Sequence, residues 1–137
     1  MNNDVTIVRS FKVFMGICMP LSMLYGVLYT FIPSLYHQWI HWPFNDPSYT
    51  GLMGCVFFSF SIGLGLAIRE TSWLKIKLFI EFSMVWLALT SIFSAWSFFG
   101  IAMPASAKPG VIEDTILTTA LFGFFLFFYR AQGKKKA

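Results

Sequence analysis

The sequence predicts an all-α membrane protein: a four-transmembrane-helix bundle with a short interfacial helix between helices 1 and 2. Composition is the first observation, because 57% of the 137 residues are hydrophobic and 12% are charged, against roughly 25% charged in soluble domains. The second is that the apolar residues form four blocks, each long enough to cross hydrocarbon. The third is the placement of the basic residues around these blocks.

Basic residues lie almost entirely on one side of the four blocks. Lys108 is the exception, because it lies in the loop between the third and fourth blocks, which is on the opposite side. Since Lys and Arg collect in cytoplasmic loops, this bias predicts a cell-membrane protein with both termini in the cytoplasm. The residues on the majority side are Arg9, Lys12, Arg69, Lys75, Lys77, Arg130, Lys134, Lys135 and Lys136.

The length and the net charge limit the kinds of protein and of partner that the sequence predicts. At 137 residues the chain is predicted to be a single integral membrane domain, residues 1–137. The net charge is +4, and the basic residues that produce it flank the apolar blocks. We therefore expect them to bind anionic lipid headgroups and not nucleic acid. Cys18 and Cys55 fall at different depths, so we expect no disulfide between them.

The first span is predicted at about 11–32, with Pro20 inside it and Pro33 after it. A proline is tolerated in a membrane helix because neighbouring helices satisfy the freed carbonyl. The block is basic at its start, as a signal peptide is, but it is long enough to span and no small-residue cleavage site follows. We therefore expect a retained helix.

Aromatic residues crowd the segment from Pro33 to Thr50, which has no Lys or Arg. Leu35, Trp39 and Trp42 recur at helical spacing. Indole and phenol rings favour the depth of the headgroups, so a short helix in the membrane interface is predicted here. The aromatic residues are Tyr36, Trp39, Trp42, Phe44 and Tyr49.

The other three spans are predicted at about 51–68, 78–100 and 111–129. The loop between the spans at 78–100 and 111–129 contains prolines, which predict an irregular connection there. Glu113 and Asp114 are expected in the first turn of that span, where a carboxylate suits the helix dipole.

Small side chains repeat every fourth residue in the second span. Lipid does not push apolar helices together, so close approach through small residues favours their association. We expect this row to build the protein's own bundle, and a homo-oligomer contact is the alternative. The row consists of Gly51, Cys55, Ser59, Gly63 and Ala67.

Glu81 is the acidic residue inside the predicted third span. A carboxylate in apolar surroundings is a candidate functional residue. An ion pair with Lys77 or Lys12, at similar depth, is the interpretation we favour. The alternative is a site for a small ligand, a quinone or a lipid, formed by Glu81, Lys77, Lys12 and Trp86.

His37 and His41 are four residues apart, a spacing that lets two imidazoles share one metal or haem. Asp46 could add an oxygen ligand, but no further His or paired Cys completes a set. Two polar residues on the wet face of an interfacial helix explain the pattern equally well. No metal or other cofactor is therefore predicted, and quinone or haem contact is left open.

A resemblance is carried by several short stretches of the chain: residues 42–47, Gly54, residues 63–70, Glu81 and Trp86. They resemble a family of small four-helix bacterial and archaeal membrane proteins, some of them grouped as DoxX-like. The resemblance implies a four-helix bundle with a partly polar interior. It also implies proximity to quinone-linked oxidoreductase complexes, with which some relatives are associated. No catalytic residue carries over.

The sequence contains no catalytic constellation: no activated nucleophile and no phosphate-binding glycine loop is recognisable. An enzyme is therefore not expected. The leading hypothesis is a non-catalytic accessory or structural subunit of a larger membrane complex, related to redox chemistry or electron transport. Its expected partners are the lipid bilayer and other membrane subunits. A ligand-binding membrane protein with its site near Glu81 is the alternative.

Overall fold

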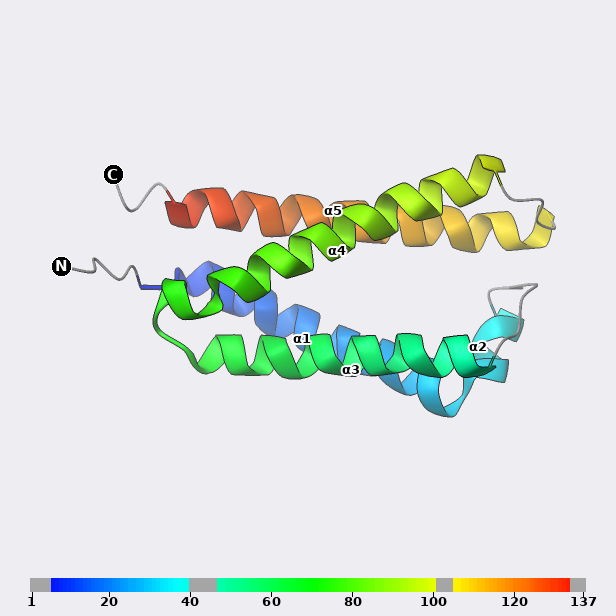
Figure 1. The fold of residues 1–137 in the computed structure, drawn as a ribbon, viewed down its shortest axis with the longest axis horizontal. Helices are drawn as coiled ribbons and strands as arrows, with labels where there is room; N and C mark the ends of the chain where they lie inside the picture. Colours follow the sequence, from blue (N-terminus) through cyan, green and yellow to red (C-terminus); the bar gives the residue numbers. More distant parts are fainter. Residues whose placement is uncertain (1–5, 40–46, 101–104, 134–137) are drawn as a thin grey trace.

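The computed structural model describes residues 6–39, 47–100 and 105–133, and these residues are helical almost throughout. It confirms the all-α prediction, with four long apolar helices and a short helix between the first two (Figure 1). The aromatic residues Trp42 and Phe44 of the predicted interfacial segment lie outside the described residues. The helices are α1 (Arg9–Phe31), α2 (Pro33–Trp39), α3 (Pro47–Arg69), α4 (Trp73–Gly100), η1 (Ala105–Ala107) and α5 (Lys108–Gly133).

Within the described residues, four helical segments are long and apolar enough to cross a membrane. The chain is therefore a multi-pass integral membrane protein. Its longest spans have 28 residues, or about 42 Å of helix, which exceeds the ~30 Å hydrocarbon core. Their ends consequently reach the headgroup layers. The spans are Arg9–Phe31, Thr50–Arg69, Trp73–Gly100 and Ala105–Gln132.

The last helix begins earlier than the sequence analysis expected. Pro109 is the second residue of α5, and a proline suits the first turn because the missing N–H has no helical acceptor there. Glu113 and Asp114 consequently lie beyond the first turn, which contains no acidic residue. The expectation that they complement the helix dipole there was wrong.

The helices form two antiparallel pairs, α1 with α3 and α4 with α5 (Figure 1). The pairs lie closest where the two ends of the chain meet. We call this the terminal end, and it contains Thr6, Ser72 and Gln132. The opposite end, which we call the far end, carries α2 and η1.

Small and hydroxyl-bearing residues bring α1 and α3 together. A Cβ built on Gly54 would collide with the Thr30 hydroxyl and lie 3.1 Å from the carbonyl oxygen of Gly26. Ser22 donates to the Phe57 carbonyl at 2.9 Å, and Ser61 donates to the Met19 carbonyl at 3.1 Å. Such close backbone approach and interhelical hydrogen bonds are the usual means of helix association in lipid.

A hydroxyl pair joins α4 to α5. Ser91 Oγ donates to Thr118 Oγ1 at 3.0 Å, while the Thr118 hydroxyl donates to the Asp114 carbonyl oxygen at 2.7 Å. Both side chains therefore satisfy their polar atoms within the helix pair.

The two pairs are held together by an apolar core at the terminal end. Phe11 and Phe14 of α1 pack on Phe125 and Phe128 of α5, with ring centroids 5.1–6.1 Å apart. Stacked and edge-on rings at this distance add to the energy of burial. The buried core consists of Ile7, Phe11, Met15, Cys18, Leu64, Ala67, Trp73, Ile76, Ile80 and Phe125.

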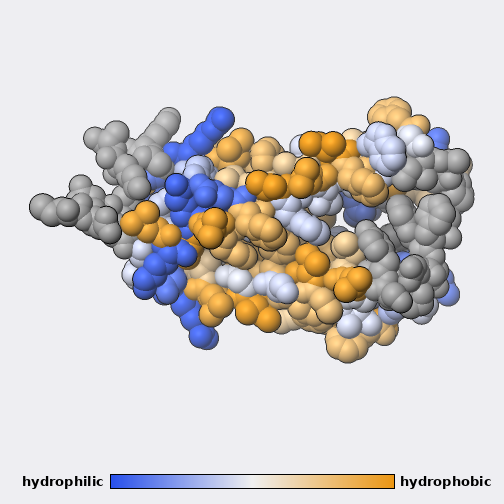
Figure 2. Space-filling model, viewed as in Figure 1, coloured by the Kyte–Doolittle hydropathy of each residue, from blue (hydrophilic) through white to orange (hydrophobic). Residues whose placement is uncertain are grey.

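The outer surface is apolar along the length of the helices. Leu78, Phe99 and Phe127 are among many large hydrophobic side chains that are exposed. Figure 2 shows hydrophobic side chains across the middle of one face and hydrophilic ones gathered toward the terminal end. Since monomeric soluble proteins rarely expose such continuous apolar area, this surface fits a lipid solvent.

Candidate functional site

Three polar side chains of α4 and α5 meet near the terminal end, around Glu81. The Tyr129 hydroxyl of α5 donates a hydrogen bond to Glu81 Oε1 of α4. Lys77 Nζ, one helical turn before Glu81, lies 3.5 Å from the same oxygen. Trp73 packs edge-on against the Tyr129 ring, with centroids 5.5 Å apart. We call these four residues the Glu81 cluster.

The Glu81 cluster is open on one side. The Glu81 side chain is 38% exposed and that of Lys77 is 42% exposed. Lys77 and Glu81 both belong to α4, so their ion pair does not itself connect two helices. The bond that ties α4 to α5 is therefore the one from Tyr129, and the carboxylate keeps further acceptor sites that another donor can reach.

Two other residues of the expected ligand site lie elsewhere. Lys12 of α1 donates through Nζ to the Ile68 carbonyl oxygen at 2.9 Å, near the C-terminus of α3, where a cation complements the helix dipole. Trp86 lies further along α4 and packs on Phe60 of α3, with centroids 6.1 Å apart. The structure thus brings Lys77 to Glu81 and places Lys12 and Trp86 in separate contacts.

The histidine pair is described only in part, because His41 and Asp46 lie outside the described residues. His37 is buried, and its Nε2 is 3.4 Å from the Thr50 hydroxyl oxygen. This contact joins α2 to α3. Among residues 6–39, 47–100 and 105–133, no group of three or more His, Cys, Asp or Glu side chains could hold a metal ion.

The row of small residues on α3 is divided between two environments. Gly63 lies against the Phe79 ring of α4, and Ala67 is buried in the core. Cys55 and Ser59 are exposed instead. A Cβ built on Gly51 would have no neighbour within 4 Å. One half of the row therefore packs inside the protein, and the half nearer the far end faces outward.

The two cysteines occupy different surroundings. Cys18 is buried in the core, and Cys55 is exposed on α3. Both are free thiols in the structure.

Gln132 joins the two ends of the chain and was not among the predicted site residues. This fully buried side chain donates from Nε2 to the Thr6 carbonyl oxygen at 2.7 Å. Its Oε1 accepts from the Val8 amide at 3.0 Å. The Ile7 amide also donates to the Thr71 carbonyl oxygen at 3.1 Å. No sequence signal marked this residue, because a glutamine before a lysine-rich tail is typical of a solvated segment.

The Tyr25 ring of α1 stacks on Phe57 of α3, with centroids 5.5 Å apart, which adds an aromatic contact to the α1–α3 pair.

Comparison of the chain with family models, with curated proteins and with solved structures finds no match. The fold itself is that of a small four-span membrane protein.

Proposed function

We propose that this protein is a non-catalytic accessory or structural subunit of a larger membrane complex. The observation that carries the proposal is the outward half of the small-residue row on α3, formed by Gly51, Cys55 and Ser59. Small residues let another helix approach closely, which is the main source of helix association in lipid. This half of the row is available to a helix from outside the protein.

The position of the core supports the same proposal. The buried cluster lies at the terminal end, around Phe11 and Trp73, whereas the open half of the row lies toward the far end of α3. A partner helix crossing α3 there would add packing at a distance from the protein's main buried cluster. Bulky neighbours such as Leu52 and Ile62 are exposed as well and could pack around such a helix.

The resemblance to DoxX-like proteins indicates the kind of complex to which the protein would belong. It favours a complex of quinone-linked electron transport in the cell membrane. The bias of the basic residues favours an orientation with both termini in the cytoplasm.

A bulky residue in the open half of the row tests the proposal. Ser59→Leu should separate the protein from its complex on a native gel of membranes solubilised in mild detergent. Ser59 is exposed, so the change should leave the protein's own fold intact. Thr119→Leu, at an exposed position of α5, is the matched control and should stay in the complex.

Two results would contradict the subunit role. The wild-type protein could migrate alone and monodisperse, in which case it has no stable partner. Alternatively, mass spectrometry of the complex could detect only copies of this chain, which would replace the accessory role with a homo-oligomer.

A small-ligand site at the Glu81 cluster is the second candidate function. The observation that favours it is the convergence of a hydroxyl, an ammonium and a carboxylate, with Glu81 partly exposed. The Lys77 ammonium can donate to a carbonyl oxygen of a quinone or to a lipid phosphate, and the Glu81 carboxylate can accept from a hydroxyl or amine of a headgroup. Lys12 and Trp86 would take no part, given their separate contacts.

Quinone titration of the purified protein tests this second candidate. Lys77→Gln and Glu81→Gln should weaken quinone binding while the helical content is preserved. Lys75→Gln removes a nearby exposed lysine that pairs with Glu70, and it should leave binding unchanged. Equal binding by all variants would contradict a ligand role for the cluster.

A further inference from the structure

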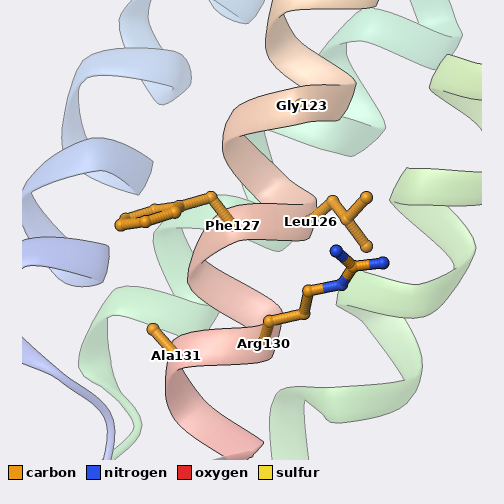
Figure 3. Close-up of a pocket in the computed structure, with 5 residues that line it drawn as sticks. All are labelled: Gly123, Leu126, Phe127, Arg130 and Ala131. Carbon is orange, nitrogen blue, oxygen red and sulfur yellow. The ribbon is translucent and has the colours of Figure 1, made fainter.

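A shallow groove runs along one face of α5 near the terminal end (Figure 3). Its volume is about 360 Å³, which falls in the lower part of the ~300–1,000 Å³ range of small-ligand sites. The residues that line it are spaced by three and four positions, so they share one face of the helix. They are Gly123, Leu126, Phe127, Arg130 and Ala131.

The groove has an open apolar end and a charged end. Gly123 lies at the apolar end, and a Cβ built on it would meet nothing within 4 Å. Arg130 lies at the other end. Figure 3 shows its side chain running back along α5, so that the guanidinium group lies beside Leu126, while Phe127 points to the other side. Gly123 and Arg130 are seven residues apart, or about 10 Å along the axis.

The Arg130 guanidinium is available to a ligand. Within the part of the chain that the structure describes, the ion pairs join Lys75 to Glu70 and Lys77 to Glu81, and neither includes Arg130. The Arg130 side chain is exposed. An arginine fork without a carboxylate partner matches a phosphate group in charge and in shape.

The depth of the groove decides what kind of molecule meets it. Arg130 lies near the end of a candidate span, close in sequence to the Tyr129 and Gln132 contacts of the terminal end. Gly123 lies deeper in the same span. A molecule with a phosphate at headgroup depth and a hydrocarbon chain below it would therefore contact both ends of the groove at once.

The charge around Arg130 favours a ligand with net negative charge. Among the described residues of the terminal end, basic side chains outnumber the acidic Glu70 and Glu81. A zwitterionic headgroup would bring its own ammonium group into this positive field, whereas an anionic headgroup would not. The basic residues are Arg9, Lys12, Arg69, Lys75, Lys77 and Arg130.

We propose that the α5 groove binds an anionic phospholipid, with the lipid phosphate on the Arg130 guanidinium and one acyl chain along Gly123 and Phe127. The site is independent of the proposed partner surface, which lies on α3. It would fix one lipid beside the helix pair α4–α5 and would make the protein sensitive to the anionic lipid content of its membrane.

Lipid titration followed by native mass spectrometry tests the charged end of the groove. The full-length protein in mild detergent is titrated with phosphatidylglycerol and, separately, with phosphatidylcholine of the same acyl chains. The wild type should bind phosphatidylglycerol more tightly. Arg130→Gln should weaken that binding about tenfold, the loss expected for a charge-assisted hydrogen bond. Arg69→Gln removes an exposed arginine of the same end that does not line the groove, and it should bind as the wild type does.

Gly123→Leu tests the apolar end. The new side chain would occupy the groove, so binding of both lipids should fall, while the open space around Gly123 leaves the fold intact. Circular dichroism and gel filtration verify the fold of each variant. The proposal is overturned if the wild type binds the two lipids equally, if Arg69→Gln loses as much affinity as Arg130→Gln, or if Gly123→Leu binds lipid unchanged.

Discussion

Gln132, in the last turn of α5, is hydrogen-bonded to the carbonyl oxygen of Thr6, which lies 126 positions earlier in the chain. The same side chain accepts a bond from the Val8 amide. The segment before α1 and the end of α5 are therefore fastened to each other. In a membrane, this contact requires Thr6 and Gln132 to lie on the same side. Four spans between them satisfy this requirement, because an even number of crossings returns the chain to the side on which it began.

Replacing Gln132 should loosen this junction. Gln132→Ala leaves the Val8 amide and the Thr6 carbonyl without their side-chain partner, and a lost buried hydrogen bond costs about 1–3 kcal/mol of unfolding free energy. The Val8 amide should exchange its hydrogen faster in detergent, as measured by mass spectrometry. Gln38→Ala, at an exposed position of α2, is the control. Equal exchange in both variants would show that the junction does not depend on Gln132.

A methyl group on Gly54 should force α1 and α3 apart. The Cβ of Gly54→Ala would collide with Thr30 and press on the backbone of α1, and overpacking of this kind costs about 1–3 kcal/mol. The expected result is a lower thermal unfolding midpoint in detergent. Gly51→Ala adds the same group where nothing lies within 4 Å, so its midpoint should stay near that of the wild type. A midpoint unchanged in both variants would contradict the close approach of the two helices at Gly54.

Tyr129→Phe should affect stability more than Lys77→Gln does. The first change removes the hydrogen bond that connects α5 to Glu81 of α4. The second removes an ion pair whose two members both lie on α4, so the link between the helices stays in place. Thermal unfolding of both variants in one detergent provides the comparison. The opposite order would show that the charge of Lys77 is what holds the Glu81 cluster together.

The existence of the four helices followed from the sequence because block length and hydropathy alone decide it. Helix ends were harder to place. Pro109 looked like a loop residue, but it also suits the first turn of a helix, and α5 begins one residue before it. α4 likewise begins at Trp73, ahead of the predicted residue 78, because Lys75 and Lys77 can extend their charges toward the headgroups from within the helix.

The candidate site was predictable only where its members share a helix. Lys77 and Glu81 are four residues apart, so their proximity follows from helical geometry alone. Tyr129 could not be assigned to them without knowing that α5 packs along α4. Lys12 has the right depth for Glu81, but depth does not fix the direction in which a side chain points, and it bonds α3 instead.

The most direct measurement of the central claim, a bundle of four spans, is the labelling of single cysteines in sealed vesicles. Cys18 and Cys55 are replaced by alanine, and one cysteine is introduced at Thr71 or at Lys108, which are exposed positions at opposite ends of the bundle. A membrane-impermeant maleimide should label one of these positions in intact vesicles and the other only after the membrane is opened. If both positions are labelled from the same side, the four helices do not cross the membrane as described.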